Sequence, residues 1–174
     1  TPLGGYVKSY TDIANGKFLG ISWLIWIAIL VAVITWFIFN MTRHGKYMYA
    51  IGGNPQAAEV AGVPVKLTLI LIYMKAAAMY GLAGFMMGAK AGGASVQTGY
   101  GYEMEAIAAC TIGGVSVTGG RGKVSSAIVG VAVFELLKAA LQYLGVDANA
   151  QYIAIGIVIF VAISLDIRKY VAKK

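Results

Sequence analysis

The stretch ISWLIWIAILVAVITWFIF, residues Ile21–Phe39, decides the fold class of this chain. It carries no charged side chain, and it matches the roughly 20 apolar residues that an α-helix needs to cross a bilayer. Three tryptophans, Trp23, Trp26 and Trp36, lie toward its ends, where indole rings favour the membrane interface. The stretch therefore predicts a transmembrane helix.

The composition of the whole chain agrees with this prediction. Of 174 residues, 59% are hydrophobic and only 12% are charged, and the mean hydropathy is +0.76. A soluble domain is about half apolar and about a quarter charged. A soluble domain of this size could not bury so much apolar surface, and a disordered chain would not contain it. Lipid is therefore the expected surroundings of most of the chain.

Four more apolar stretches follow the first, at residues 67–89, 104–118, 124–143 and 152–167. We therefore expect an all-α, polytopic transmembrane bundle of about five spans. The 104–118 stretch is short and contains Gly113-Gly114, so it is either a thin span or a broken helix. In the 67–89 stretch, small residues at helical spacing predict close helix packing: Ala77, Gly81, Gly84 and Gly88, continuing to Gly92.

The charges predict an orientation. The chain has 14 Lys+Arg against 7 Asp+Glu, a net charge of +7. Basic residues gather between spans and in the tail, so we interpret them by the positive-inside rule and not as a nucleic-acid surface. This makes the 40–66 loop and the C-terminus cytoplasmic and residues 1–20 a periplasmic loop. Because residues 1–20 contain no signal-peptide pattern, we expect further helices upstream. The basic residues that predict this orientation are Arg43, Lys46, Lys66, Arg121, Lys123, Arg168, Lys169, Lys173 and Lys174.

The 40–66 loop contains the signals of a short helix. Asn54 is a favourable N-cap, and Pro55 takes the first helical position. Gly62 is placed as the C-terminal cap, and Pro64 blocks extension. The loop therefore predicts a helix of about two turns, and Gly52-Gly53 before it predicts a sharp entry. Its small outer face suits docking into a protein better than lying on lipid; the residues are Ala57, Ala58 and Ala61.

Charged residues inside the fourth stretch are costly. Glu135 and Lys138 are three residues apart and therefore share a helix face, which Gln142 extends. A charge at the bilayer centre costs about 2.5–3.5 kcal/mol on insertion scales. They are interpreted either as a structural pair inside the bundle, with Lys138 alternatively reaching the interface, or as the polar lining of a transport path. Glu105, with Glu103, is explained by its place at a helix N-terminus.

Catalytic and metal-binding residues are scarce. Cys110 is the only cysteine and His44 the only histidine, which excludes an intrachain disulfide and a His-rich metal site. The sequence contains no Gly-x-x-x-x-Gly-Lys-[Ser/Thr] nucleotide-binding motif. We expect no enzyme activity, no metal and no cofactor in this chain.

Two blocks of the sequence resemble monosaccharide ABC-importer permeases. The loop positions Gly52, Gly53, Asn54, Ala57, Ala58, Gly62 and Val63 match that family's cytoplasmic coupling loop. The segment EMEAIAACTIGGVSVTGGRG, residues Glu103–Gly122, is similar to the family's second block. The ending Leu165–Tyr170 resembles the galactose/methyl-galactoside branch more than the ribose and xylose branches. The resemblance covers nearly all of residues 43–174.

The resemblance implies that residues 1–174 are the C-terminal half of one permease domain in a bacterial plasma membrane. Its function would be import of a monosaccharide, galactose or a methyl galactoside in particular. Implied partners are an ATP-hydrolysing subunit that binds ATP and Mg²⁺, a periplasmic or lipid-anchored sugar-binding protein, a second permease copy and lipid. The residues implied to dock the ATPase are Gly52, Gly53, Asn54, Pro55, Ala57, Ala58 and Gly62.

Other functions stay open at this point. One is half of a dimeric secondary transporter or channel, which broken helices would suit. Another is a permease of the ribose or xylose class. A third is a scaffold or an inactive permease fragment, although a scaffold has no need of the capped loop helix.

Overall fold

A computed structural model describes the backbone of residues 3–171, and the side chains there except at 3, 148, 165, 166 and 169–171. The chain forms two compact units, Thr1–Gly45 with Pro64–Tyr100, and Lys46–Val63 with Gly101–Lys174. The segment Leu165–Tyr170 carried the resemblance to the galactose/methyl-galactoside branch, and most of its side chains are not described. Lys173 and Lys174 lie outside the described residues altogether.

The first unit is built on two long helices, α2 (Trp23–Met41) and α5 (Val65–Ala91). The Ser22 hydroxyl caps α2 by accepting a hydrogen bond from the Leu24 N–H at 3.3 Å, so the helix starts slightly later than predicted. Gly92, in the left-handed conformation, ends α5. No residue of α2 is buried within this chain.

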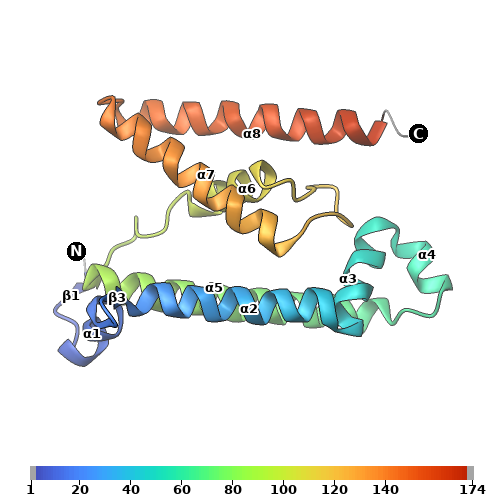
Figure 1. Ribbon diagram of the computed structural model, residues 1–174, viewed down its shortest axis with the longest axis horizontal. Helices are drawn as coiled ribbons and strands as arrows, with labels where there is room; N and C mark the ends of the chain where they lie inside the picture. The colour runs from blue at the N-terminus through green and yellow to red at the C-terminus, as the bar shows by residue number, and fades with distance from the viewer. Residues whose placement is uncertain (1–2, 172–174) are drawn as a thin grey trace. The chain divides into compact units, whose positions relative to one another are not determined.

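A short helix in the first unit, α1 (Lys8–Asn15), was not predicted from the sequence, which indicated only a loop over residues 1–20. It contacts both α2 and α5, and Figure 1 shows it at one end of this pair. Two small antiparallel pairs adjoin it: β1 (Leu3–Gly4) with β4 (Gly93–Ala94), and β2 (Lys17–Phe18) with β3 (Ile21–Ser22). Both strand pairs tie this segment to the long helices.

The small residues of α5 have two different surroundings. A Cβ at Gly88 would lie 2.7 Å from the Tyr10 hydroxyl oxygen, and that hydroxyl donates to the Phe85 carbonyl at 2.6 Å. Gly88 therefore makes room for an aromatic side chain of α1. Among the described residues, nothing lies within 4 Å of a Cβ placed at Gly81 or Gly84. The predicted close packing is present at only one end of the ladder.

The segment between α2 and α5 contains two helices where one was predicted. Helix α3 (Arg43–Gly53) precedes α4 (Pro55–Val60). Gly52 and Gly53 are the last residues of α3, so the prediction that they form a sharp loop entry was wrong. His44 lies in the first turn of α3, and burial lowers its pKa below the ordinary value, with a further contribution from the positive charge of Lys75.

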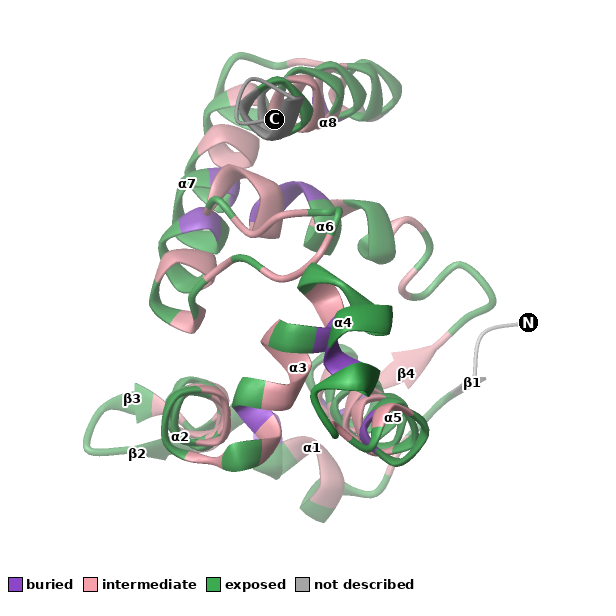
Figure 2. Ribbon diagram, turned by 90° about the vertical axis from the view of Figure 1, so that its right-hand side faces the viewer, coloured by how far each residue is buried: buried purple, intermediate pink, exposed green. Residues whose placement is uncertain are grey.

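The second unit packs one short helix between two longer ones. Helix α6 (Tyr102–Ile112) contacts both α7 (Val124–Tyr143) and α8 (Ala148–Val171). Their shared core consists of Ala108, Ala109, Phe134 and Ile155. Figure 2 shows buried segments of α6 and of α7 where these two helices meet.

Glycine lets α6 and α7 approach at backbone distance. A Cβ placed at Gly130 of α7 would lie 2.1 Å from the Ala109 carbonyl oxygen and 2.5 Å from the Gly113 nitrogen. Small residues permit this kind of helix contact in membranes. The contact fixes where the end of α6 lies on α7.

The all-α bundle is confirmed, and α6 differs in length from the other expected spans. Within residues 3–171, three helices are long and apolar enough to cross a membrane, namely α2, α5 and α7, and α8 has a shorter apolar part, Asn149–Ser164. Helix α6 has 11 residues, or about 16 Å at 1.5 Å per residue, roughly half of a hydrocarbon core of about 30 Å. Of the two alternatives for 104–118, the structure has the broken helix.

We predict that Gly130→Ala destabilises the protein. The added methyl group meets backbone atoms of α6 that cannot rotate away, and overpacking of this kind costs about 1–3 kcal/mol or more. Gly156→Ala is the matched control, because nothing within the described residues lies within 4 Å of its Cβ position on α8. Thermal unfolding in detergent should show a lower midpoint for Gly130→Ala alone. Equal midpoints for the two variants would contradict the close contact.

Candidate functional site

Helix α4 is closed at both ends by its own sequence. The Asn54 side chain accepts a hydrogen bond from the Ala57 N–H at 3.0 Å, and Pro55 occupies the first turn. At the other end, Gly62 has a positive φ of 81°. Its N–H donates to the Glu59 carbonyl, and that of Val63 donates to the Ala58 carbonyl, which is the Schellman arrangement. These caps confirm the helix predicted here, apart from the earlier end at Val60.

The faces of α4 differ from the prediction at one residue. Ala57 and Ala61 are exposed, and Val60 is 91% exposed. Ala58, predicted on the same outward face, is 4% exposed and belongs to the inner side. Figure 2 shows most of α4 as exposed. The available docking surface is therefore narrower than the sequence indicated.

The last turn of α3 contacts the glycine-rich loop between α6 and α7. A Cβ at Gly52 would lie 2.5 Å from the Gly120 nitrogen, and one at Gly119 would lie 2.7 Å from the Gly52 carbonyl oxygen. The Tyr49 hydroxyl donates to the Gly122 carbonyl at 2.8 Å. Two backbones can approach this closely only where neither carries a side chain. The two sequence blocks identified above thus meet here, a contact that sequence reasoning missed.

The 113–123 loop has a defined conformation. Gly114, with a φ of 80°, ends α6, and the Val115 N–H donates to the Cys110 carbonyl. The Ser116 N–H then donates to the Arg121 carbonyl at 3.1 Å and closes the turn. Gly119 and Gly120 also have positive φ values. Glycine is required twice over at these positions, by conformation and by the contact with α3.

An ion pair joins α6 to α7. The Lys138 ammonium lies 2.7 Å from both carboxylate oxygens of Glu105, and the two side chains are 24% and 16% exposed. The ammonium is also 5.7 Å from the centre of the Tyr102 ring, a cation–π distance.

This ion pair corrects the predicted structural pair. A structural pair of Glu135 with Lys138 was one of the interpretations left open, but the bonded partner of Lys138 is Glu105, which the sequence had explained by its helix N-terminus alone. Glu135 and Gln142 are exposed within this chain. A search for a carboxylate in the preceding helix would have found the partner.

Metal-binding groups do not gather in the described part of the chain. No three His, Cys, Asp or Glu side chains there could hold a metal ion together. Cys110 is a half-buried free thiol in α6. The arrangement as described consists of a capped surface helix, a glycine backbone contact and an interhelical ion pair.

Comparison with known proteins assigns the family. Residues 4–163 match the family described as branched-chain amino acid transport system / permease component. The chain belongs to this permease family. The capped helix α4 and the 113–123 loop both lie within the matched residues.

The relatives of this permease include named sugar permeases. It is 39% identical over 178 residues to the galactose/methyl galactoside import permease protein of Haemophilus influenzae, covering 100% of this chain and 53% of that one. It is 44% identical over 147 residues to the Treponema pallidum protein of the same name, and the match covers 84% of this chain and 28% of that protein. It is 34% identical over 154 residues to the ribose import permease protein of Escherichia coli, and the match covers 88% of this chain and 48% of that protein.

The chain spans about half the length of the Haemophilus and Escherichia relatives. No solved structure matches it.

We predict that breaking the α6–α7 ion pair costs more than removing it. Glu105→Gln or Lys138→Met alone leaves one partly buried charge without its counter-ion, a loss of about 3–5 kcal/mol for buried pairs. The double variant should recover much of this loss. Glu103→Gln, at an exposed position on the same helix, is the control. Thermal unfolding midpoints of the four variants test this, and additive single effects would contradict it.

Proposed function

We propose that this chain is the C-terminal half of the membrane subunit of an ATP-driven monosaccharide importer. Galactose or a methyl galactoside is the proposed substrate, supported by the names of the relatives with 39% and 44% identity. The ribose permease at 34% identity is further away. The proposed location is the bacterial plasma membrane, with α3, α4 and the C-terminus in the cytoplasm.

The observation that carries this proposal is the capped helix α4. A six-residue helix is too short to be stable alone, yet both its ends are hydrogen-bonded and its outer side chains are exposed. We propose that Ala57, Val60 and Ala61 fit into a cleft of an ATP-hydrolysing partner subunit. The ATP and Mg²⁺ belong to that subunit, and this chain itself hydrolyses nothing.

The same contacts provide a route for the coupling. Movement of α4 displaces the end of α3, because only Asn54 separates the two helices. The Gly52–Gly120 contact and the Tyr49–Gly122 hydrogen bond then transmit this displacement to the 113–123 loop. That loop joins α6 to α7, so ATP-driven motion at α4 reaches the membrane helices. A second permease copy and a periplasmic or lipid-anchored sugar-binding protein complete the proposed importer.

The docking surface is tested on the complete permease. Ala57→Arg and Val60→Arg place a bulky charge on the exposed face of α4, and both should abolish retention of the ATPase subunit in a pull-down. Val96→Arg is the control, because Val96 is 99% exposed and lies on the side predicted to be periplasmic. Ala58→Arg is unsuitable, since Ala58 is buried. If the parent permease retains no ATPase subunit and transports sugar on an ion gradient, a secondary transporter replaces this proposal.

The coupling route is tested by a matched pair of glycines. Gly52→Ala places a methyl group 2.5 Å from the Gly120 nitrogen, whereas nothing in the described chain lies within 4 Å of a Cβ at Gly53. We expect Gly52→Ala to reduce ATP-driven sugar uptake at least tenfold with the ATPase subunit still bound, and Gly53→Ala to transport normally. Equal uptake by both variants would contradict this route.

A further inference from the structure

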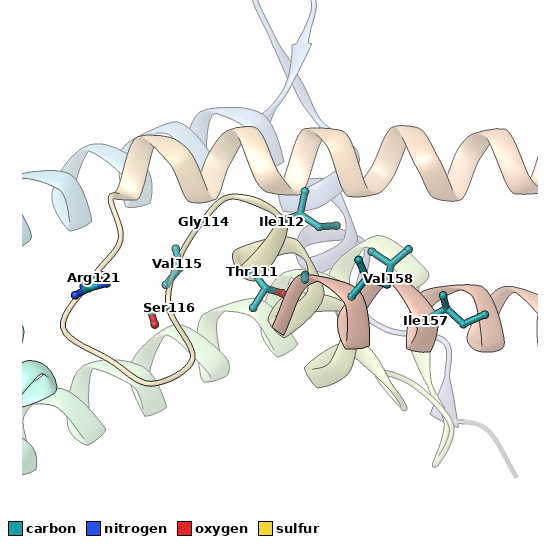
Figure 3. A pocket seen from close by; sticks show the side chains of 10 residues that line it. Thr111, Ile112, Gly114, Val115, Ser116, Arg121, Ile157 and Val158 are labelled. Atoms are coloured by element: carbon teal, nitrogen blue, oxygen red, sulfur yellow. The ribbon is translucent and has the colours of Figure 1, made fainter. Parts of the chain in front are cut away.

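A hollow of about 630 Å³ lies beside the end of α6. One wall belongs to the end of α6 and the following loop, and it includes Thr111, Ser116 and Arg121. The opposite wall is the apolar face of α8, with Ile157, Val158 and Val161. Figure 3 shows the end of α6, the loop that follows it, and the neighbouring stretch of α8. The volume lies within the range of about 300–1,000 Å³ that is usual for small-molecule sites.

The hollow lies where α6 stops after 11 residues, which are too few to cross a membrane. Backbone that is not helical at membrane depth is found only where protein surrounds it or where it lines a water-filled cavity. In transporters, interrupted helices of this kind form substrate sites near the bilayer midplane. Ile157–Ala162 lies near the middle of α8, which agrees with this depth.

The two walls differ in chemistry. The Thr111 hydroxyl donates to the carbonyls of α6, so its oxygen can still accept a hydrogen bond. The Ser116 hydroxyl is paired with that of Thr118 at 2.8 Å. Among the side chains that the structure describes, no carboxylate lines the hollow, and Arg121 is the one charged lining residue. A wall that carries hydroxyls, facing an apolar wall, suits an uncharged sugar ring, which has hydroxyl edges and a C–H face.

We propose that this hollow is a binding site for the transported monosaccharide on its way through the permease. The proposal rests on the proposed sugar-import function and adds the place where the sugar binds. The 113–123 loop forms a wall of the hollow and also contacts Gly52 of α3. A displacement of α3 therefore changes the shape of the site. Because few polar groups line it, binding is weak, as release to the next compartment requires.

Sugar protection of an introduced thiol tests binding directly. Ser116→Cys in a Cys110→Ala background, in the complete importer in nanodiscs, is treated with a maleimide. Galactose at millimolar concentration should slow labelling at least threefold, and mannitol should not. Val117→Cys is the control, because Val117 is 55% exposed and is not among the lining residues; its labelling should not change. Labelling slowed by added phosphatidylglycerol but not by galactose would overturn the proposal in favour of a lipid site.

Filling the hollow provides a second, independent readout. Val158→Trp should reduce galactose uptake at least tenfold while ATP hydrolysis stimulated by the sugar-binding protein persists. Ile153→Trp, at a 67% exposed position on the same helix, should transport normally. Normal uptake by Val158→Trp, with no protection at position 116, would overturn the site and leave the import function standing. Absence of ATP-driven uptake in the parent would instead contradict the proposed function itself.

Discussion

Every peptide group that is shielded from water needs a hydrogen-bond partner, and the end of α6 is where this need is hardest to meet. Inside a continuous helix the requirement is satisfied locally. After Ile112 it is met by a Schellman turn at Gly114 and by the bond from Ser116 to the Arg121 carbonyl. The remaining shielding comes from α7, at the Gly130 contact, and from α8. The packing of the second unit is thus organised around one interrupted helix.

The features that could be predicted from the sequence are those that depend on neighbouring residues. The bounds of α7 agree with the apolar stretch at 124–143, and α2 is displaced by only two residues at each end. The caps of α4 were predictable for the same reason, because Asn54, Pro55 and Gly62 act within one turn. The Gly113-Gly114 pair raised the possibility of a break at the end of α6, but the sequence could not choose between a break and a thin span.

The features that could not be predicted depend on contacts between distant segments. Helix α1 is held by a hydrogen bond from Tyr10 to Phe85, 75 residues away, and its own sequence is too polar to indicate burial. The Lys138–Glu105 pair spans 33 residues, so the helix-spacing rule favoured the wrong carboxylate. The only trace in the sequence of the contact between Gly52 and Gly119-Gly120 is the presence of these glycines. Glycines in such positions are equally typical of a turn. At the candidate site, helix α4 was predictable from the sequence, whereas the contact between α3 and the 113–123 loop was not.

The position of α1 has a mechanical consequence for the first unit. It is bonded to α5 through Tyr10, and the Ser22 hydroxyl at the start of α2 bonds to its Ala14 carbonyl at 3.2 Å. The neighbouring ends of the two long helices are therefore joined through α1, which acts as a brace. Helix α2, at about 1.5 Å per residue, is a lever arm of about 28 Å. If α2 tilts by about 5° about the end that contacts α1, the other end of a helix of this length moves by roughly 2.5 Å. Small rotations at the braced end are thereby amplified where the chain enters α3.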